Sequence, residues 1–584
     1  MGPADILAQP IPRSISQAAS IMKRHSVALL MTICVVSLLS SSLSHAAVSG
    51  DFTYTDRGDT ITITRYNGTG GDIIIPDTID GKPVTTIGSY AFMDKVKKNS
   101  TLTLPSTLTT IGDKAFRGCS GFTGTLTLPS TLAGIEDSAF WDCSGFSGSL
   151  VIPEGVTTIE CGAFYNCSGF TGTLTLPSTL TTIGTYAFSG CSGFTGTLTL
   201  PSTLTTIEGG AFAGCDGFTG ALTIPEGVST IGEQAFSNCS GFSGTLTLPS
   251  TLTEIGNGAF YSCYGFTGSL VIPDGVTSIG DRAFLNCIRF TGSLTLPSTL
   301  TTIGDGAFYG CSGFTGSLTL PEGLTTVDFN AFSYCSGFNG ALKLPSSLIT
   351  IRSRAFEYCS GFTGTLTLPS TLTEIGQEAF YGCIGLTGSL VIPEYVTMIG
   401  EGSFRNCSGF TGSLTLPHNL TRIGYSAFAD CRGFTGSLTI PEGVSTIGNK
   451  AFEDCSGFTG SLVIPEGVSS IGSNAFHNCS GFAGTLTLPS TLTTIGFSAF
   501  RGCRGISKAV FFGNAPRKMG DQAYRTIGLR RFPLEYAQKN MGDHVFKDTA
   551  EGFLIVCSPE STGFTFPFWK GYPCKRETVE AAGK

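Results

Sequence analysis

The sequence repeats itself with a period of 24 residues over most of its length. Residues 167–191 read CSGFTGTLTLPSTLTTIGTYAFSGC, and close variants of this phrase precede and follow it. A cysteine recurs every 24 residues from Cys119 to Cys503, seventeen times in all, and no insertion or deletion shifts the register. Such a period is typical of a solenoid, in which each coil stacks on an identical neighbour around one continuous core. The 584 residues therefore do not divide into several separate globular domains.

Each unit predicts one extended strand followed by turns that carry further buried side chains. Leu126 and Leu128 are two residues apart and share one face of a strand, whereas Thr125 and Thr127 share the other face. Pro129 has no N–H to donate and ends the strand. The remaining inward side chains of this coil are expected at Leu132, Ile135, Ala139, Phe140, Cys143 and Phe146.

The N-terminus predicts export. A short basic stretch, Met22-Lys23-Arg24-His25, precedes an apolar run over residues 27–39, and Ser44-His45-Ala46 supplies small residues for cleavage after Ala46. Residues 1–46 are therefore predicted to be a signal peptide, with Met22 as an alternative start. The apolar run is short for a transmembrane helix, so no transmembrane segment is expected after cleavage.

At this point the repeat resembles a known family. The pattern L-x-L-P-x-x-L-x-x-I-x-x-x-A-F-x-x-C is similar to the BspA-like class of bacterial leucine-rich repeats. The matching residues in one unit are Leu174, Leu176, Pro177, Leu180, Ile183, Ala187, Phe188 and Cys191. The resemblance covers residues 73–512 and implies a curved right-handed leucine-rich repeat solenoid with a parallel β-sheet on one face. It also implies adhesion to host or matrix proteins or to other cells.

The two ends of the repeat array differ from its middle, as the ends of a solenoid must. Residues 51–75 alternate like a hairpin, and residues 47–72 are expected to form an N-terminal β cap. The period is lost after Phe511, so residues 513–584 are predicted to form an irregular C-terminal cap and tail. The closing phrase GFTFPFWKGYPC resembles the C-terminal cap of the same family. Cys557 and Cys574 lie outside the repeated cysteines and are candidates for a disulfide in this cap.

The seventeen repeated cysteines are predicted to be a buried row of free thiols. Metal sites use short spacings such as C-x-x-C that bring several ligands to one point, whereas a 24-residue period spreads them along a line. Aligned parallel side chains about 4.8 Å apart also have poor geometry for a disulfide. We expect no metal or cofactor, and Cys161, which falls outside the row, has no assigned role.

Several function classes find no support in the sequence. Charged residues make up 13% of the chain and the net charge is −8, without a basic run, which argues against nucleic-acid binding. There is no H-E-x-x-H or G-x-S-x-G phrase and no catalytic residue is proposed, so an enzyme is not expected. Rows of threonine on the strand face resemble those of ice-binding solenoids. However, Val151, Val271 and Lys343 interrupt them, so ice binding is a remote third reading.

A partner has two candidate surfaces. The residue after each repeat phenylalanine varies from copy to copy and forms a line along the solenoid, with arginines 117, 405 and 501 near its ends. The aromatic members of this line are Trp141, Tyr165, Tyr261, Tyr309 and Tyr381. The other candidate is the exposed strand face, represented by Thr245, Ser293 and Thr365, which the family resemblance favours. Neutral drift at exposed turns would explain the variation without any ligand.

The sequence thus predicts a secreted or cell-surface binding protein without catalytic activity. Its expected partner is an extracellular protein or glycan, bound through the solenoid surface. The alternative is a structural component of an envelope or biofilm matrix that has no specific ligand.

Overall fold

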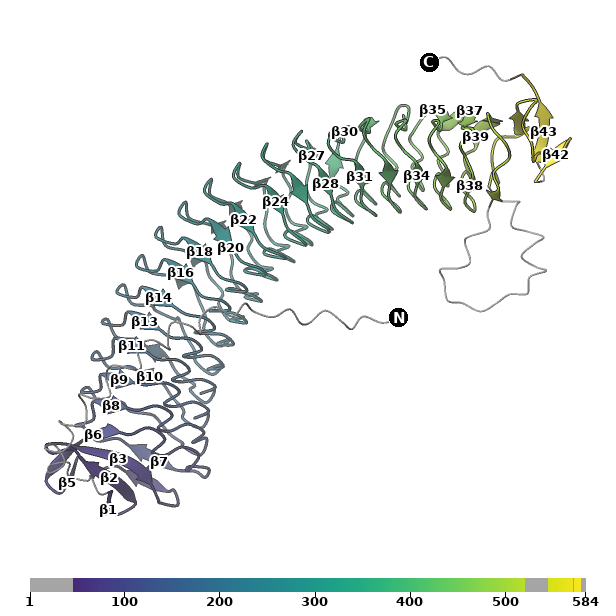
Figure 1. Cartoon of the computed structure of the whole chain (residues 1–584). Coiled ribbons are helices and arrows are strands. Elements are labelled where there is room, and N and C mark those ends of the chain that lie inside the picture. Colours follow the sequence, from purple (N-terminus) through teal and green to yellow (C-terminus); the bar gives the residue numbers. More distant parts are fainter. Residues whose placement is uncertain (1–45, 520–544, 571, 579–584) are drawn as a thin grey trace, which may run out of the picture.

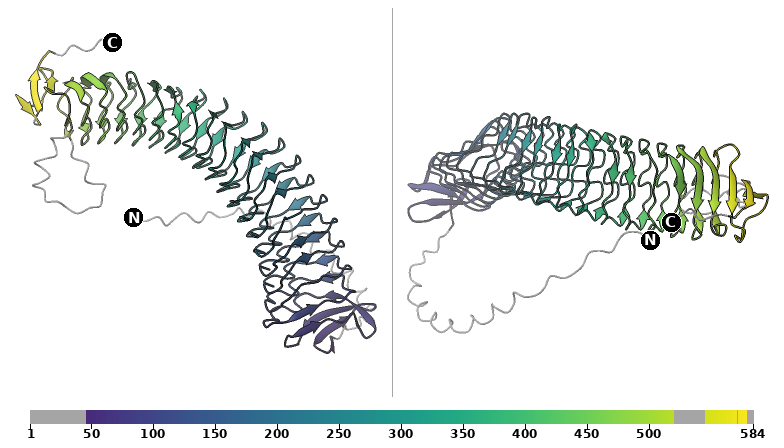
Figure 2. Two further views of the ribbon diagram at one scale, coloured as in Figure 1. Left: turned by 180° about the vertical axis from the view of Figure 1, so that it is seen from behind. Right: turned by 90° about the horizontal axis from the view of Figure 1, so that it is seen from above.

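The chain forms an arched rod of stacked coils. The structure is a computed structural model, and it describes residues 46–519, 545–570 and 572–578. Figure 1 shows successive coils side by side along the arc, with the N-terminal strands at one end and the C-terminal strands at the other. The views in Figure 2 agree with this arrangement. The predicted solenoid is confirmed, whereas the predicted signal peptide falls almost wholly on residues 1–45, outside the described residues.

The N-terminal end of the rod is closed by an antiparallel hairpin. Its strands pair in the order β1-β2-β3, and β3 then pairs in parallel with β6, which begins the stack. The side chains of Ile61 and Ile63 are fully buried, as the alternation in this segment predicts. The strands at this end are β1 (Ala47–Ser49), β2 (Phe52–Asp56), β3 (Ile61–Tyr66), β4 (Asp72–Ile74), β5 (Thr78–Ile79), β6 (Lys82–Ile87) and β7 (Thr101–Thr103).

Asp80 and Gly81 connect β5 to β6 through a tight turn. Both have positive φ angles, of 51° and 74°, and the flanking strands are antiparallel. An Asp-Gly pair is the preferred sequence for a two-residue hairpin turn that needs this conformation at both positions. The turn therefore adds a short antiparallel hairpin to the first coil.

The longest parallel ladder is not on the strand that the sequence predicts. It lies at the Thr-Ile step after the proline, where residues such as Ile183 and Ile207 pair between successive coils. The strands of this row are β8 (Thr110–Ile111), β9 (Gly134–Ile135), β11 (Thr158–Ile159), β13 (Thr182–Ile183), β14 (Thr206–Ile207), β16 (Thr230–Ile231), β18 (Glu254–Ile255), β20 (Ser278–Ile279), β22 (Thr302–Ile303), β24 (Thr326–Val327), β26 (Thr350–Ile351), β28 (Glu374–Ile375), β31 (Met398–Ile399), β33 (Arg422–Ile423), β34 (Thr446–Ile447), β36 (Ser470–Ile471), β38 (Thr494–Ile495) and β40 (Lys518–Met519).

The predicted strand before the proline forms a second row, which is mostly broken into pairs of coils. In the coil taken above, Leu126 is buried and Leu128 is half-buried, so the predicted inward pair is only partly enclosed. The second row contains β10 (Leu150–Val151), β12 (Leu174–Thr175), β15 (Leu222–Thr223), β17 (Leu246–Thr247), β19 (Leu270–Val271), β21 (Leu294–Thr295), β23 (Leu318–Thr319), β25 (Leu342–Lys343), β30 (Leu390–Val391), β32 (Leu414–Thr415), β35 (Gly460–Val463) and β37 (Phe482–Leu488). Strand β29 (Leu386–Thr387) lies earlier in its coil, before β30, and pairs with β27 (Gly364–Thr365).

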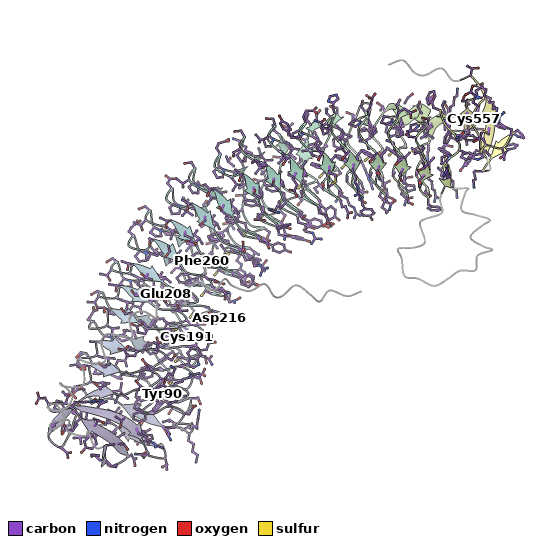
Figure 3. The ribbon with its side chains drawn as sticks, in the orientation of Figure 1. Tyr90, Cys191, Glu208, Asp216, Phe260 and Cys557 are labelled. Atoms are coloured by element: carbon purple, nitrogen blue, oxygen red, sulfur yellow. The ribbon has the colours of Figure 1, made fainter. Side chains whose placement is uncertain are left out.

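Two stacks of phenylalanine rings run through the core. The first contains the Phe of each Ala-Phe pair from Phe92 to Phe500, in which only Phe404 follows a serine instead. Neighbouring ring centroids are 4.8–5.6 Å apart. The second contains the Phe three residues after each cysteine from Phe122 to Phe482 and is interrupted at Leu386. Phe260, in the first stack, is labelled in Figure 3. Offset stacking of this kind adds a specific contribution to each inter-coil contact beyond the burial of area.

The seventeen repeated cysteines form a third row between the coils. Each thiol is buried and donates a hydrogen bond to the carbonyl oxygen of the repeat phenylalanine in the preceding coil, at 2.9–3.2 Å. Cys191, a member of this row, is labelled in Figure 3. All seventeen are free thiols, as the sequence predicts. They contribute a polar contact in addition to their small apolar volume.

The stacking continues past the point where the sequence period ends. Phe546 stacks on Phe500 at 5.7 Å, and the N–H of Phe500 donates to the carbonyl of Val545, so Val545-Phe546 takes the place of an Ala-Phe pair. The C-terminal strands are β39 (Gly505–Phe511), β41 (Leu554–Cys557), β42 (Phe568–Trp569) and β43 (Tyr572–Arg576). Strand β39 pairs in parallel with both β37 and β41, which joins this end to the array.

Replacing Phe308 by alanine should destabilise the protein by about 3 to 5 kcal/mol, because the change leaves a cavity in a well-packed stack. Phe308 is fully buried and its ring lies 5.3 Å from those of Phe284 and Phe332. The place of Tyr309 on the variable line suggested an exposed side chain, but the structure shows that it is half-buried. Its replacement by alanine should still cost much less. Urea unfolding of the two variants tests this, and equal losses would contradict the assignment of inward and outward positions.

Cysteines 119 to 503 of the row should resist alkylation in the folded, unreduced protein and react as free thiols once denaturant is added. Burial excludes the reagent and also disfavours the reactive thiolate. Cys557 and Cys574 should react only after reduction, if they form the predicted disulfide. Mass spectrometry of the alkylated peptides distinguishes these cases. Neighbouring cysteines of the row linked in pairs would contradict the structure.

The array should lose stability at alkaline pH under reducing conditions. Burial raises the pKa of the Cys119 thiol to about 11 and that of Cys191 to about 12, whereas an unfolded cysteine titrates near about 8.5. Above that pH the unfolded chain loses protons that the folded chain keeps. Each coil is then destabilised by about 1.4 kcal/mol per pH unit up to the folded pKa. The urea midpoint should change little from pH 7 to 8 and fall steeply by pH 9.5; a constant midpoint would refute this.

Candidate functional site

The side chains that vary from coil to coil surround the Ala-Phe pair. In the unit that contains Ala187 and Phe188, the residue before the pair, Tyr186, has a φ of 55°, and Gly190 has a φ of 75°. The same two positions have positive φ angles in every coil from Tyr90 to Gly502. We call these two positions, together with the residue directly after the phenylalanine, the Ala-Phe flank.

The left-handed conformation explains which residues occupy two of the three flank positions. Glycine adopts it freely and asparagine and aspartate accept it better than most residues, which matches the frequent Gly, Asn and Asp at these positions. Bulky residues such as Tyr186, Tyr334 and Tyr358 also occur there, at a conformational cost of about 1 kcal/mol each. The backbone of the flank is thus constant while its side chains differ.

The first group of predicted site residues forms a compact aromatic cluster. The rings of Trp141 and Tyr165 stack with centroids 3.9 Å apart, and the guanidinium of Arg117 lies 5.2 Å over the Trp141 ring. Tyr186 of the next coil meets Tyr165 edge-on at 6.4 Å. We call Arg117, Trp141, Tyr165 and Tyr186 the first aromatic cluster. Tyr186 is 43% exposed, and Trp141 and Tyr165 are half-buried.

The second group is joined by two tyrosines that the sequence did not single out. Tyr334 lies 5.4 Å from Tyr309, and Tyr358 lies 5.0 Å from Tyr334 and 4.8 Å from Tyr381. The guanidinium of Arg405 lies 5.4 Å over the Tyr381 ring and ends the row. These five residues are the second aromatic cluster. Tyr334 and Tyr358 stand one residue later in the repeat than Tyr309 and Tyr381, so a search at a single repeat position misses them.

Charged groups lie against the second aromatic cluster. Glu357 is buried, accepts a hydrogen bond from the Ser333 hydroxyl at 3.1 Å, and its desolvation raises its pKa. Arg354 donates to Glu378 at 2.6 Å. A hydrogen bond with Tyr381, together with burial, raises the pKa of Tyr358 to about 12. The Tyr358 hydroxyl therefore stays neutral near pH 7.

Tyr261 belongs to neither cluster and lines a groove instead. The groove has a volume of about 480 Å³ and crosses three successive coils. Within the described residues no aromatic ring stacks on Tyr261. The lining residues are Glu233, Gln234, Ser237, Asn238, Asn257, Gly258, Tyr261, Asp281 and Arg282. The sequence contained a signal for Tyr261 alone, because the other lining residues are polar groups of a type common at turns.

The alternative surface, the exposed strand face, has a uniform character. Thr245, Ser293 and Thr365 are exposed, and so are Thr125, Thr173 and Thr197 at the same repeat position in other coils. Val151 and Val271 interrupt the hydroxyl rows and are 55% and 57% exposed. Small hydroxyl side chains seldom dominate the energy of an interface.

The remaining candidate residues are cysteines. Cys557 and Cys574 are buried in neighbouring strands, β41 and β43, and burial together with the adjacent Cys557 thiol raises the pKa of Cys574 to about 11. Both are free thiols in the structure, and the disulfide stays a prediction. Cys161 is exposed on its coil. Within the described part of the chain, no group of three or more His, Cys, Asp or Glu side chains is placed to hold a metal ion.

The described residues contain no helix that is long and apolar enough to cross a lipid bilayer.

Comparison with known proteins identifies the repeat. Six overlapping stretches match the family described as "BspA type Leucine rich repeat region", at residues 85–219, 171–291, 219–339, 264–387, 340–459 and 458–554. A search of curated proteins finds no significant match.

Three solved structures are similar to the chain over much of their own length. A leucine-rich repeat protein from Bacteroides ovatus is 23% identical over 80% of this chain and 94% of its own, with a TM-score of 0.39. A leucine rich cell surface protein from Faecalibacterium prausnitzii is 21% identical over 80% and 95%, with a TM-score of 0.29. The leucine-rich repeat protein of T. pallidum is 30% identical over 38% and 90%, with a TM-score of 0.27. Because the family match spans most of residues 85–554, the chain belongs to the BspA-type leucine-rich repeat proteins.

Proposed function

We propose that this protein is a secreted or cell-surface binding protein that recognises an extracellular macromolecule through the Ala-Phe flank and performs no chemistry. The observation that carries the proposal is the second aromatic cluster, a continuous row of four tyrosines and one arginine across successive coils. Tyrosine and arginine are among the residue types that most often dominate binding energy at protein interfaces.

The rigidity of this cluster supports the proposal. Each ring is packed against its neighbour at a tilt of 30° to 56°. The backbone beneath the rings is fixed by hydrogen bonds to the next coil, such as that from Tyr358 N–H to the Tyr381 carbonyl at 2.6 Å. A partner would therefore bind aromatic groups that have already lost most of their conformational freedom. Pre-organised groups of this kind give a larger share of their contact energy to affinity.

The orientation of the rings favours a protein partner at the second cluster. The rings of Tyr334 and Tyr358 lie 5.0 Å apart at an angle of 30°, so each ring partly covers one face of the other. Tyr334 is 41% exposed and ends in a neutral hydroxyl that both donates and accepts hydrogen bonds. A surface with an apolar body and hydroxyl tips suits a mixed polar and apolar protein surface.

The proposal is tested by replacing Tyr309, Tyr358 and Tyr381 by serine, after a partner has been selected from a panel of purified extracellular-matrix proteins. Serine already occupies equivalent positions at Ser189, Ser262 and Ser237, so the coils should remain folded. We expect at least a tenfold loss of affinity by surface plasmon resonance, with little change in the thermal unfolding midpoint.

The control replaces Thr245, Ser293 and Thr365 by glutamate on the strand face, and it should leave affinity unchanged. If the tyrosine variant keeps full affinity while the control loses it, binding occurs on the strand face and the proposed site is wrong. If the chain binds only to other copies of itself, a structural role in an envelope or matrix replaces the proposed function.

A further inference from the structure

The groove beside Tyr261 differs in chemistry from both aromatic clusters. Its lining contains two carboxylates, one guanidinium, three amides, one hydroxyl and a single aromatic ring. The side chains that line the groove therefore offer both hydrogen-bond donors and acceptors in planar groups. The two carboxylates and the arginine leave a formal charge of only −1, which does not favour a strongly charged ligand.

One coil along the groove lacks a side chain that both of its neighbours have. Gln234, Gly258 and Arg282 occupy the same left-handed position in three successive coils, with φ angles of 56°, 57° and 56°. A Cβ atom at Gly258 would lie 3.3 Å from Cγ of Gln234 and 3.6 Å from Cβ of Tyr261. The missing side chain thus leaves a gap that is bordered by the longer side chains on each side.

The small residue beside Tyr261 leaves its ring without a stacking partner. Ser237 occupies the equivalent position in the preceding coil and is buried, and Leu285 occupies it in the following coil. In the two aromatic clusters this neighbouring space is filled by another ring or by an arginine. Tyr261 is half-buried and lines the groove, so part of its ring remains available to a ligand.

Several polar groups of the groove are positioned but keep unused hydrogen-bonding capacity. Asn257 accepts the N–H of Asp281 through its Oδ1 at 2.8 Å, which holds its amide in place while its Nδ2 has no partner in the described chain. Asn238 donates to the Ser237 hydroxyl at 3.1 Å and keeps its own Oδ1 free within the same part of the chain. The Arg282 guanidinium forms no ion pair with any described residue. These groups are ready to bind a ligand without first breaking internal bonds.

From this geometry we infer that the groove binds a neutral saccharide unit. A pyranose ring offers many hydroxyl groups for the planar amides and carboxylates and an apolar C–H face for the Tyr261 ring. Three coils about 4.8 Å apart span about 10 Å, which is enough for two pyranose rings. The volume also falls in the range of small-ligand sites. The inference rests on the proposed function, since it adds a glycan site to the same Ala-Phe flank.

The test measures the binding of the purified full-length chain to an array of neutral oligosaccharides, followed by isothermal titration with the best disaccharide. Replacing Gly258 by glutamine should reduce affinity at least tenfold, because the new side chain fills the gap. Gln234 already occupies this position in the preceding coil with the same backbone conformation, so the variant should fold. Replacing Tyr261 by serine should also weaken binding at least tenfold.

The matched control replaces Gly402 by glutamine. Gly402 occupies the same repeat position with a φ of 60°, and a Cβ there would lie 3.2 Å from Cγ of Glu378 and 3.9 Å from Cβ of Arg405, much as at Gly258. It lies far from the groove along the rod, so its replacement should leave saccharide affinity unchanged. Equal losses in the Gly258 and Gly402 variants, or no binding of any neutral saccharide, would overturn the inference.

The two proposals fail in different ways. If the chain binds no neutral saccharide but still binds the protein partner selected through the second aromatic cluster, only the proposed glycan site is wrong. Loss of protein binding in the Tyr309, Tyr358 and Tyr381 variant with saccharide binding intact supports both sites.

Discussion

The contact between each side chain and its own copy in the next coil is the interaction on which the whole structure depends. Phe308 touches Phe284 and Phe332, and the Cys335 thiol donates to the Phe308 carbonyl. Neither contact exists within a single coil, so no coil can be stable alone. The strict 24-residue register follows from this constraint, since one inserted residue would displace the phenylalanine, cysteine and isoleucine rows together.

The sequence predicts the part of the fold that this constraint governs. The buried set Leu132, Ile135, Phe140 and Cys143 could be read from one unit because identical neighbours require identical inward groups. The division of the strands into two rows could not, because apolar alternation marks the Leu-x-Leu segment while the longest ladder forms at Thr-Ile steps that carry no alternation. The last coil could not be predicted from the sequence either, because Phe546 stacks on Phe500 across a sequence separation that breaks the period.

The candidate site was predictable only where it repeats at a single position. Trp141 and Tyr165 share such a position and do lie together. Tyr334 and Tyr358 reach the second cluster from a left-handed position one residue later, and only the backbone geometry shows that the two positions converge. Gly258 lines the groove, and its missing side chain stands out only by comparison with Gln234 and Arg282 at the same position of the neighbouring coils. The core residues and the candidate recognition residues thus occupy separate positions of one repeat.

The interruption of the second phenylalanine stack at Leu386 has a mechanical consequence. Because coils contact only their neighbours, a force applied to the two ends passes through every interface in series, and the weakest one opens first. Leu386 stands between Phe362 and Phe410 without a stacked ring on either side, which makes this the expected point of rupture. One detached coil of 24 residues can extend to about 80 Å. A rod fixed at one end and loaded at the other would therefore lengthen in discrete steps and dissipate tension before either end detaches.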